Sequence, residues 1–143
     1  MSHKGPLFGN PRPGLTYPER PGAYAVIPRR DGCFAFVRGI SGRLFLPGGG
    51  IEEGETPEIA LFRELAEEIG WSGRLVHSLG QASEYVIAMS GNALLVRGVY
   101  FQLDLIDRLP GPCEYEIVWK APAAAASELA RRCDAWAISQ VRL

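Results

Sequence analysis

The sequence is poor in cysteine and histidine, and it lacks any long apolar run. Its 143 residues include three cysteines and two histidines. Cys33, Cys113 and Cys133 form no C-x-x-C pair, so neither a zinc site nor a redox motif is indicated. Because no stretch of about 18 apolar residues occurs, no membrane partner is expected. No apolar secretory signal is recognisable either, and the expected location is therefore cytoplasmic.

Neither sign of charge is in excess. The chain has 15 lysines and arginines against 16 aspartates and glutamates, for a formal net charge of −1. A protein that grips nucleic acid through many phosphates usually has a basic face, and this balance leaves little surplus for one. We therefore expect a small-molecule partner and no nucleic acid. A local basic pocket for one polyphosphate is still allowed, and monomer and homodimer both stay open.

The backbone-breaking residues divide the chain. Residues 1–22 are rich in glycine, proline and arginine, which predicts an irregular lead-in segment. Residues 23–143 are long enough for a single domain with its own core. The pair Asp31-Gly32, between two apolar runs, predicts a hairpin. Strands are predicted at 23–28, 33–38, 44–46, 75–81, 84–88, 94–105 and 116–120, and one or two helices within 123–141. This order favours an α/β or α+β fold.

One helix is predicted with defined ends, from Thr56 to Ile69. Thr56 is a suitable N-cap, Pro57 suits the first helical position, and Gly70 suits the C-terminal end. Its apolar residues recur at helical spacing and predict one buried face. They are Ile59, Leu61, Phe62, Leu65, Ala66 and Ile69.

The opposite face of this helix is acidic. Glu64, Glu67 and Glu68 fall within an arc about 100° wide, and the small side chain of Ala60 on that face would leave room for a ligand. An acidic helix face is by itself usually solvated surface. Three neighbouring like charges nevertheless repel each other, and a bound divalent cation would offset that repulsion. Carboxylate oxygens are the preferred ligands of Mg²⁺, which often shares them with substrate phosphates.

A glycine-rich segment precedes the helix and supports this interpretation. Gly48, Gly49 and Gly50 allow the backbone to turn tightly and to approach a ligand, and a backbone carbonyl there could join the metal shell. Arg63, on the helix flank, could pair with Glu55 from the loop and hold loop and helix in register.

Together these residues resemble the Nudix box, Gly-x5-Glu-x7-Arg-Glu-U-x-Glu-Glu-x-Gly-U, where U is a bulky aliphatic residue. The resemblance covers 23 residues, from Gly49 to Trp71. Trp71, at the last U position, departs from the pattern because it is aromatic, and we expect it to alter packing and not chemistry. The positions that match are Gly49, Glu55, Arg63, Glu64, Leu65, Glu67, Glu68 and Gly70.

The resemblance implies the Nudix fold, an α/β/α sandwich around a mixed β-sheet. It also implies a Mg²⁺- or Mn²⁺-dependent hydrolase that cleaves a pyrophosphate bond in a nucleoside diphosphate linked to another group. The metal ligands would be Glu64, Glu67 and Glu68, one of them a candidate general base. The other residues that the resemblance implies are the carbonyl of Gly48 or Gly49 in the metal shell, Arg63 and Glu55 as an orienting pair, and a further acidic ligand at Glu116 or, second, Glu114.

Substrate contacts are less defined by the sequence. Arg38 and Arg43 are the candidates for phosphate or substrate binding, followed by Arg20 and Arg97, although an arginine of this kind is more often ordinary surface. Aromatic residues that could stack on a base, or simply pack in the core, are Tyr17, Tyr24, Phe36, Tyr85 and Phe101. The alternatives are a catalytically silent Nudix-fold nucleotide-binding or regulatory module, an RNA-processing enzyme, and a structural protein with a fortuitously acidic helix.

Overall fold

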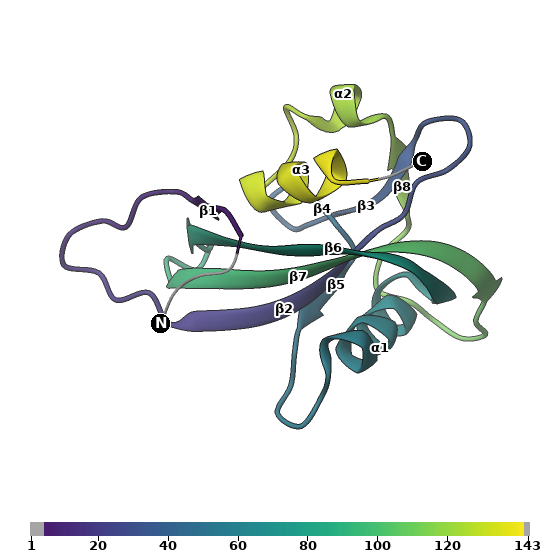
Figure 1. Cartoon of the computed structure of the whole chain (residues 1–143), viewed down its shortest axis with the longest axis horizontal. Helices are drawn as coiled ribbons and strands as arrows, with labels where there is room; N and C mark the ends of the chain where they lie inside the picture. Colours follow the sequence, from purple (N-terminus) through teal and green to yellow (C-terminus); the bar gives the residue numbers. More distant parts are fainter. Residues whose placement is uncertain (1–4, 142–143) are drawn as a thin grey trace.

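Two β-sheets with helices on both sides make up the part of the chain that this computed structural model describes, residues 5–141 (Figure 1). The larger sheet has the strand order β1-β6-β7-β2-β5, and the smaller has the order β4-β3-β8. The strands are β1 (Leu7–Phe8), β2 (Glu19–Val26), β3 (Phe34–Arg38), β4 (Leu44–Phe45), β5 (Gly48–Gly50), β6 (Trp71–Ile87), β7 (Ala93–Arg108) and β8 (Val118–Lys120). The helices are α1 (Pro57–Ile69), α2 (Pro122–Ala125) and α3 (Arg132–Ser139).

The larger sheet is mixed, as expected. β2 runs parallel to β7 and antiparallel to β5, while β6 and β7 form a long antiparallel pair. α1 lies on one side of this sheet and α3 on the other (Figure 1). Two apolar clusters result, one on the side of each helix. The expected α/β/α layering is therefore confirmed.

The ends of α1 follow from local sequence. The Thr56 hydroxyl accepts a hydrogen bond from the Ile59 N–H, and Pro57 occupies the first turn. Gly70 ends the helix with φ +71°, a left-handed conformation that glycine adopts without strain. The predicted helix is confirmed at both ends. Its buried face differs in one respect: Ala60 is fully buried and Ile59 is exposed, so Ala60 packs in the core and leaves no room for a ligand.

The cap of α1 gives a stability prediction. Thr56→Ala removes the acceptor of the Ile59 N–H, which lies 3.2 Å from the hydroxyl. We expect the free energy of unfolding to fall by about 1 kcal/mol, measured by urea denaturation. Thr56→Ser keeps the hydroxyl and is the matched control. An equal loss in both variants would show that the cap does not stabilise the helix.

The lead-in segment is more regular than the sequence indicates. The boundary placed at residue 22 is too late, because β2 begins at Glu19 and pairs with β7 from its first residue. β1 also lies in this segment and pairs with β6. These pairings join residues far apart in the chain, so they cannot be predicted from the local content of glycine and proline. Residues 1–4 of the predicted lead-in lie outside the described residues.

Three other strand predictions differ from the structure. The turn at Asp31-Gly32 is present, with the Arg29 N–H donating to the Cys33 carbonyl, but β2 and β3 diverge beyond it into different sheets. The strands predicted at 75–81 and 84–88 are one strand, β6, with irregularities in its pairing. The glycines at 48–50 form β5 because β2 supplies their hydrogen-bonding partners.

Among residues 5–141, no helix is long and apolar enough to cross a bilayer.

Candidate active site

β5 brings the glycines against α1. An added Cβ at Gly48 would lie 2.2 Å from the Ala23 carbonyl oxygen, because β2 passes directly behind it. An added Cβ at Gly49 would lie 2.6 Å from the Glu64 carboxyl carbon. The Glu64 carboxylate therefore rests on a stretch of backbone that only glycine leaves open.

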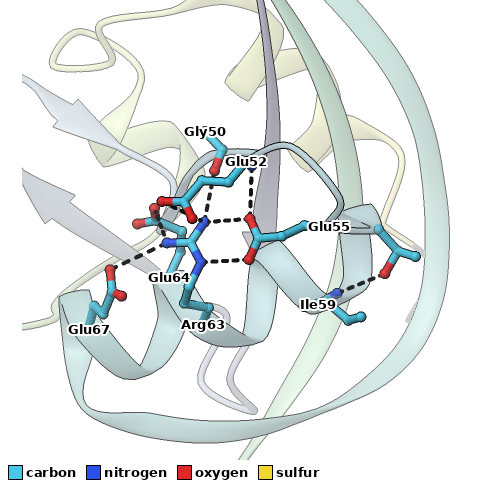
Figure 2. A network of polar contacts seen from close by, with 8 residues as sticks. Gly50, Glu52, Glu55, Ile59, Arg63, Glu64 and Glu67 are labelled. Atoms are coloured by element: carbon cyan, nitrogen blue, oxygen red, sulfur yellow. Dashed lines mark hydrogen bonds and ion pairs between the residues drawn. The ribbon is translucent and has the colours of Figure 1, made fainter.

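Arg63 ties the loop before α1 to the helix (Figure 2). Its guanidinium donates two hydrogen bonds to the Glu55 carboxylate, at 2.7 and 2.8 Å, and one to the Gly50 carbonyl at 3.1 Å. Nη1 reaches Glu64 at 3.0 Å and the half-exposed Glu67 at 3.5 Å. Hydrogen bonds from Arg63 and from the Glu52 N–H lower the pKa of Glu55 to about 2. The pairing expected from the spacing is present and fixes loop and helix together.

Glu68 is a part-buried carboxylate that contacts the β5 backbone. Its Oε1 accepts a hydrogen bond from the Gly48 N–H at 2.8 Å. Burial raises the pKa of Glu68 to about 7, the Gly48 hydrogen bond opposes that rise, and the charges of Glu64, Glu114 and Glu67 add to it. A buried carboxylate among like charges is an environment that a cation would stabilise.

A later segment docks on the C-terminal end of α1. The N–H groups of Glu114 and Tyr115 donate to the carbonyls of Glu67 and Glu68, at 3.1 and 2.8 Å. These bonds satisfy carbonyls that the end of a helix leaves unpaired. They also explain why the charge of Glu114 acts on Glu68. Glu116 instead lines a cavity with Ile69 and Trp71, so Glu114 is the better placed of the two candidates.

A cavity of about 350 Å³ lies beside Glu68 and the β5 glycines. Two arginines and three aromatic residues contribute to its wall, and they come from β2, the β4 region and later segments. This set of lining residues is Arg20, Tyr24, Phe45, Tyr115 and Arg131. The cavity wall thus has two cationic side chains, three aromatic rings and the Glu68 carboxylate. Such a wall suits a ligand that carries both an aromatic ring and phosphate groups.

Arg131 was not singled out by its sequence context. Its guanidinium carbon lies 5.8 Å from the centre of the Tyr24 ring and 5.2 Å from that of Phe45, and it donates to the Tyr24 hydroxyl at 3.2 Å. Arg131 immediately precedes α3, more than 60 residues after α1. Only the packing of α3 on the sheet brings it to this cavity, so no local signal could have identified it.

Comparison with known families decides the class of protein. The model of the NUDIX domain matches residues 18–126. The chain belongs to the Nudix family.

Similar proteins agree with that membership. The RNA pyrophosphohydrolase of Gluconobacter oxydans is 43% identical over 63 residues, which are 39% of this chain and 35% of that protein. The one from Tolumonas auensis is 39% identical over 79 residues, 54% of this chain and 41% of that protein. These matches thus span well under half the length of either relative. Among solved structures, a NUDIX hydrolase from Nitrosomonas europaea has a TM-score of 0.68 at 22% identity, covering 85% of this chain and 87% of that chain. That likeness supports the fold alone.

The Nudix-box carboxylates are not arranged around a common point at which they could bind a cation. Glu64 and Glu67 are both directed at the Arg63 guanidinium (Figure 2). Across residues 5–141, no group of three or more histidine, cysteine, aspartate or glutamate side chains is arranged to hold a metal ion.

The arginines expected to contact substrate have other partners in this Nudix domain. Arg38 forms an ion pair with Glu128 at 2.8 Å, and Arg43 donates to the Ser127 carbonyl at 3.0 Å. Both are thereby tied to the chain between α2 and α3. Arg97 pairs with Glu19, and only Arg20 of the four considered lines the cavity.

The aromatic residues considered for base stacking lie in different parts of the structure. Tyr24 lines the cavity, whereas Phe36 and Phe101 are buried in the two apolar clusters. Tyr17 and Tyr85 pack against each other edge to face, with ring centres 5.1 Å apart. Tyr24 is therefore the one member of the predicted set that is placed to meet a ligand in this cavity.

Asp134 anchors the chain just ahead of the glycines and gives a pH prediction. It is 1% exposed and accepts a hydrogen bond from the Leu46 N–H at 3.1 Å. Burial raises its pKa to about 6, while the nearby Arg131 lowers it. Because the folded pKa is the higher one, this group stabilises the fold fully below its ordinary pKa of 3.8 and loses that contribution as the pH rises through 6.

We expect Asp134→Asn to remove this part of the pH dependence. The wild-type free energy of unfolding should fall relative to that of the variant by up to about 1.4 kcal/mol per pH unit between pH ~4 and ~6. Urea denaturation across that range measures the free energy of unfolding of both proteins. The contributions of the other carboxylates are the same in each and cancel in the difference. Parallel profiles would mean that Asp134 is not protonated in the folded state.

Proposed function

We propose that this Nudix protein is a divalent-cation-dependent hydrolase that cleaves a pyrophosphate bond in a nucleoside diphosphate linked to another group. The observation that carries the proposal is a complete set of box carboxylates on α1, of which Glu68 lines a cavity with two arginines and three aromatic residues. The relatives named RNA pyrophosphohydrolase support the type of bond that is cleaved. We further propose a small nucleotide-like substrate and a cytoplasmic location.

The donor set fits Mg²⁺ or Mn²⁺. Glu64, Glu67 and Glu68 offer hard oxygen ligands, with the carbonyl of Gly48 or Gly49 and the carboxylate of Glu114 as further donors. Within residues 5–141, the part-buried Glu68 lies near other carboxylates and has no basic side chain at ion-pair distance. A bound divalent cation would neutralise phosphate charge and lower the pKa of a water molecule.

The residues of the chain then have distinct roles. Arg63 and Glu55 hold the loop against α1, so that Glu64 stays on the β5 backbone. Glu67 is 52% exposed and could accept the proton of the attacking water at a carboxylate oxygen. Arg20 and Arg131 would bind phosphate oxygens or a base edge, and catalysis would rest mainly on position and charge.

A catalytically silent nucleotide-binding module is the main rival. Such a module has no need of three helix carboxylates, and in this chain all three are present on α1, with Glu68 in the wall of the cavity. The rival would bind the same ligands through Arg20, Arg131 and the aromatic residues. Turnover is therefore what separates the two functions.

The test is a hydrolysis screen with the full chain. Nucleoside triphosphates, dinucleoside polyphosphates, nucleotide sugars and dinucleotide cofactors are incubated with Mg²⁺ or Mn²⁺, and the products are identified by phosphorus NMR. We expect at least one compound to be split between two phosphorus atoms, and EDTA to abolish the reaction. Binding of a nucleotide by the folded protein without turnover of any compound would favour the silent module.

A further inference from the structure

Two adjoining cavities lie close to the candidate active site. One of about 330 Å³ and one of about 690 Å³ are both lined by Trp71 and Trp119. We call the surface that they form the Trp71–Trp119 groove. Tyr115 lines both the smaller of these cavities and the cavity beside Glu68. The groove therefore adjoins the active site.

The groove is rich in arginine, although the chain as a whole is almost neutral. Arg29, Arg30, Arg74 and Arg108 line it and all are exposed. Arg29 pairs with Asp31, and Arg74 pairs with Asp104. Within residues 5–141, Arg30 and Arg108 have no carboxylate at ion-pair distance. Two arginines are thus available to an anionic ligand.

The aromatic residues of the groove are only partly buried. Trp71 and Trp119 both keep part of their surface exposed, and the Arg29 guanidinium lies 4.3 Å from the centre of the Trp119 ring. Indole rings and guanidinium planes are the surfaces on which unpaired nucleobases stack. Trp71 is also the residue that departs from the box pattern, whose aliphatic side chain would offer no such surface.

We infer that the Trp71–Trp119 groove binds a single-stranded oligonucleotide, with bases on Trp71 and the Arg29–Trp119 pair and phosphates on Arg30 and Arg108. Two adjoining cavities exceed what one mononucleotide fills, and the shared wall at Tyr115 lets the same chain continue toward Glu68. The inference deepens the proposed function and rests on it only for the part of the ligand in the active site. It replaces the expectation of no nucleic acid, which was based on net charge.

Binding is tested without metal and without hydrolysis. The full chain is titrated with a six-nucleotide single-stranded RNA that has a 5′-hydroxyl, at low salt, and tryptophan fluorescence is followed. We expect quenching and a saturable curve, with uridine monophosphate binding at least tenfold more weakly. No quenching by the RNA, or equal affinity for the mononucleotide, would overturn the inference.

Variants assign the binding to the groove. Trp71→Leu restores an aliphatic residue and should weaken binding about 5- to 150-fold through the loss of one stacking surface. Arg30→Ala with Arg108→Ala should weaken binding and lower the slope of log affinity against log salt by about 0.7 per arginine. Arg132→Ala, an exposed arginine on α3, is the matched control and should change neither. Wild-type binding by both groove variants would also overturn the inference.

The two proposals fail separately. The RNA used has no pyrophosphate, so its binding does not depend on catalysis. Hydrolysis of a small nucleotide should be unchanged by Arg30→Ala and Arg108→Ala, because neither residue lines the cavity beside Glu68. Oligonucleotide binding without hydrolysis of any compound would refute the proposed function alone. Hydrolysis without oligonucleotide binding would refute the groove alone.

Discussion

Glu67→Gln is expected to lower the rate of pyrophosphate hydrolysis by about 10²–10⁴-fold. Glutamine has nearly the same shape as glutamate, but it cannot accept a proton from water at neutral pH and is a poor ligand for a hard cation. Glu67 is half exposed and makes only a 3.5 Å contact with Arg63. The fold should therefore tolerate the change. Steady-state kinetics on the compound found in the hydrolysis screen measures the effect.

Glu58→Gln is a matched control for this loss. Glu58 is an exposed glutamate in the first turn of α1, away from the cavity beside Glu68. It should retain the wild-type rate, and both variants should unfold at closely similar urea concentrations. Equal turnover by Glu67→Gln and wild type would remove Glu67 from the catalytic residues. Equal losses in the two variants would indicate a general effect of helix charge.

Gly49→Ala is expected to reduce hydrolysis on the order of 10²-fold, because a displacement of about 1 Å at a catalytic group can cost that much. The new Cβ would lie 2.6 Å from the Glu64 carboxyl carbon and 2.8 Å from both its oxygens. Glu64 must therefore leave its position on β5. The measurement is kcat with Mn²⁺ in excess, together with the metal concentration needed for half-maximal activity.

Gly50→Ala is the control on the neighbouring residue. An added Cβ at Gly50 meets nothing closer than 3.8 Å, at Arg20, and Gly50 has no left-handed φ. Its activity should stay within a few-fold of wild type. If Gly49→Ala is no worse than Gly50→Ala, then the close approach of Glu64 to the backbone has no part in the reaction.

The parts of the structure that the sequence predicted well are those with local causes. The helix α1 begins at Pro57 and ends at Ile69 because Thr56 and Gly70 cap it, and each cap is adjacent in the chain to the helix end that it sets. The contact of Arg63 with Glu55 follows from their spacing, because Glu55 lies just before the Thr56 cap and Arg63 lies in the first two turns of α1. Membership in the Nudix family was likewise predicted from one contiguous segment, and the family model that matches 18–126 confirms it.

The parts that the sequence did not predict depend on distant pairing. β5 exists because β2 lies beside it, and Arg131 reaches the cavity because α3 packs on the sheet. The sequence favours Glu116 over Glu114, but Glu114 is the one whose backbone is hydrogen-bonded to the end of α1, a contact that residue types do not encode. The net charge of the chain likewise did not indicate the arginines of the Trp71–Trp119 groove, because the fold brings them together from distant segments. A sum over the chain carries no information about where the charges lie.

The central position of β2 sets a scale for any ligand that occupies both sites. Tyr24 lies in β2 and lines the active-site cavity, whereas Arg29 lies three residues past the end of β2 and lines the groove. The two are five residues apart, roughly 17 Å at the rise of a β-strand. Pairing with β5 and β7 holds β2 in place, and a bridge between Pro28 and Phe34 holds the segment that follows it. The distance between the two sites is therefore fixed. The affinity for oligonucleotides should rise in a step once the oligonucleotide is long enough to reach both.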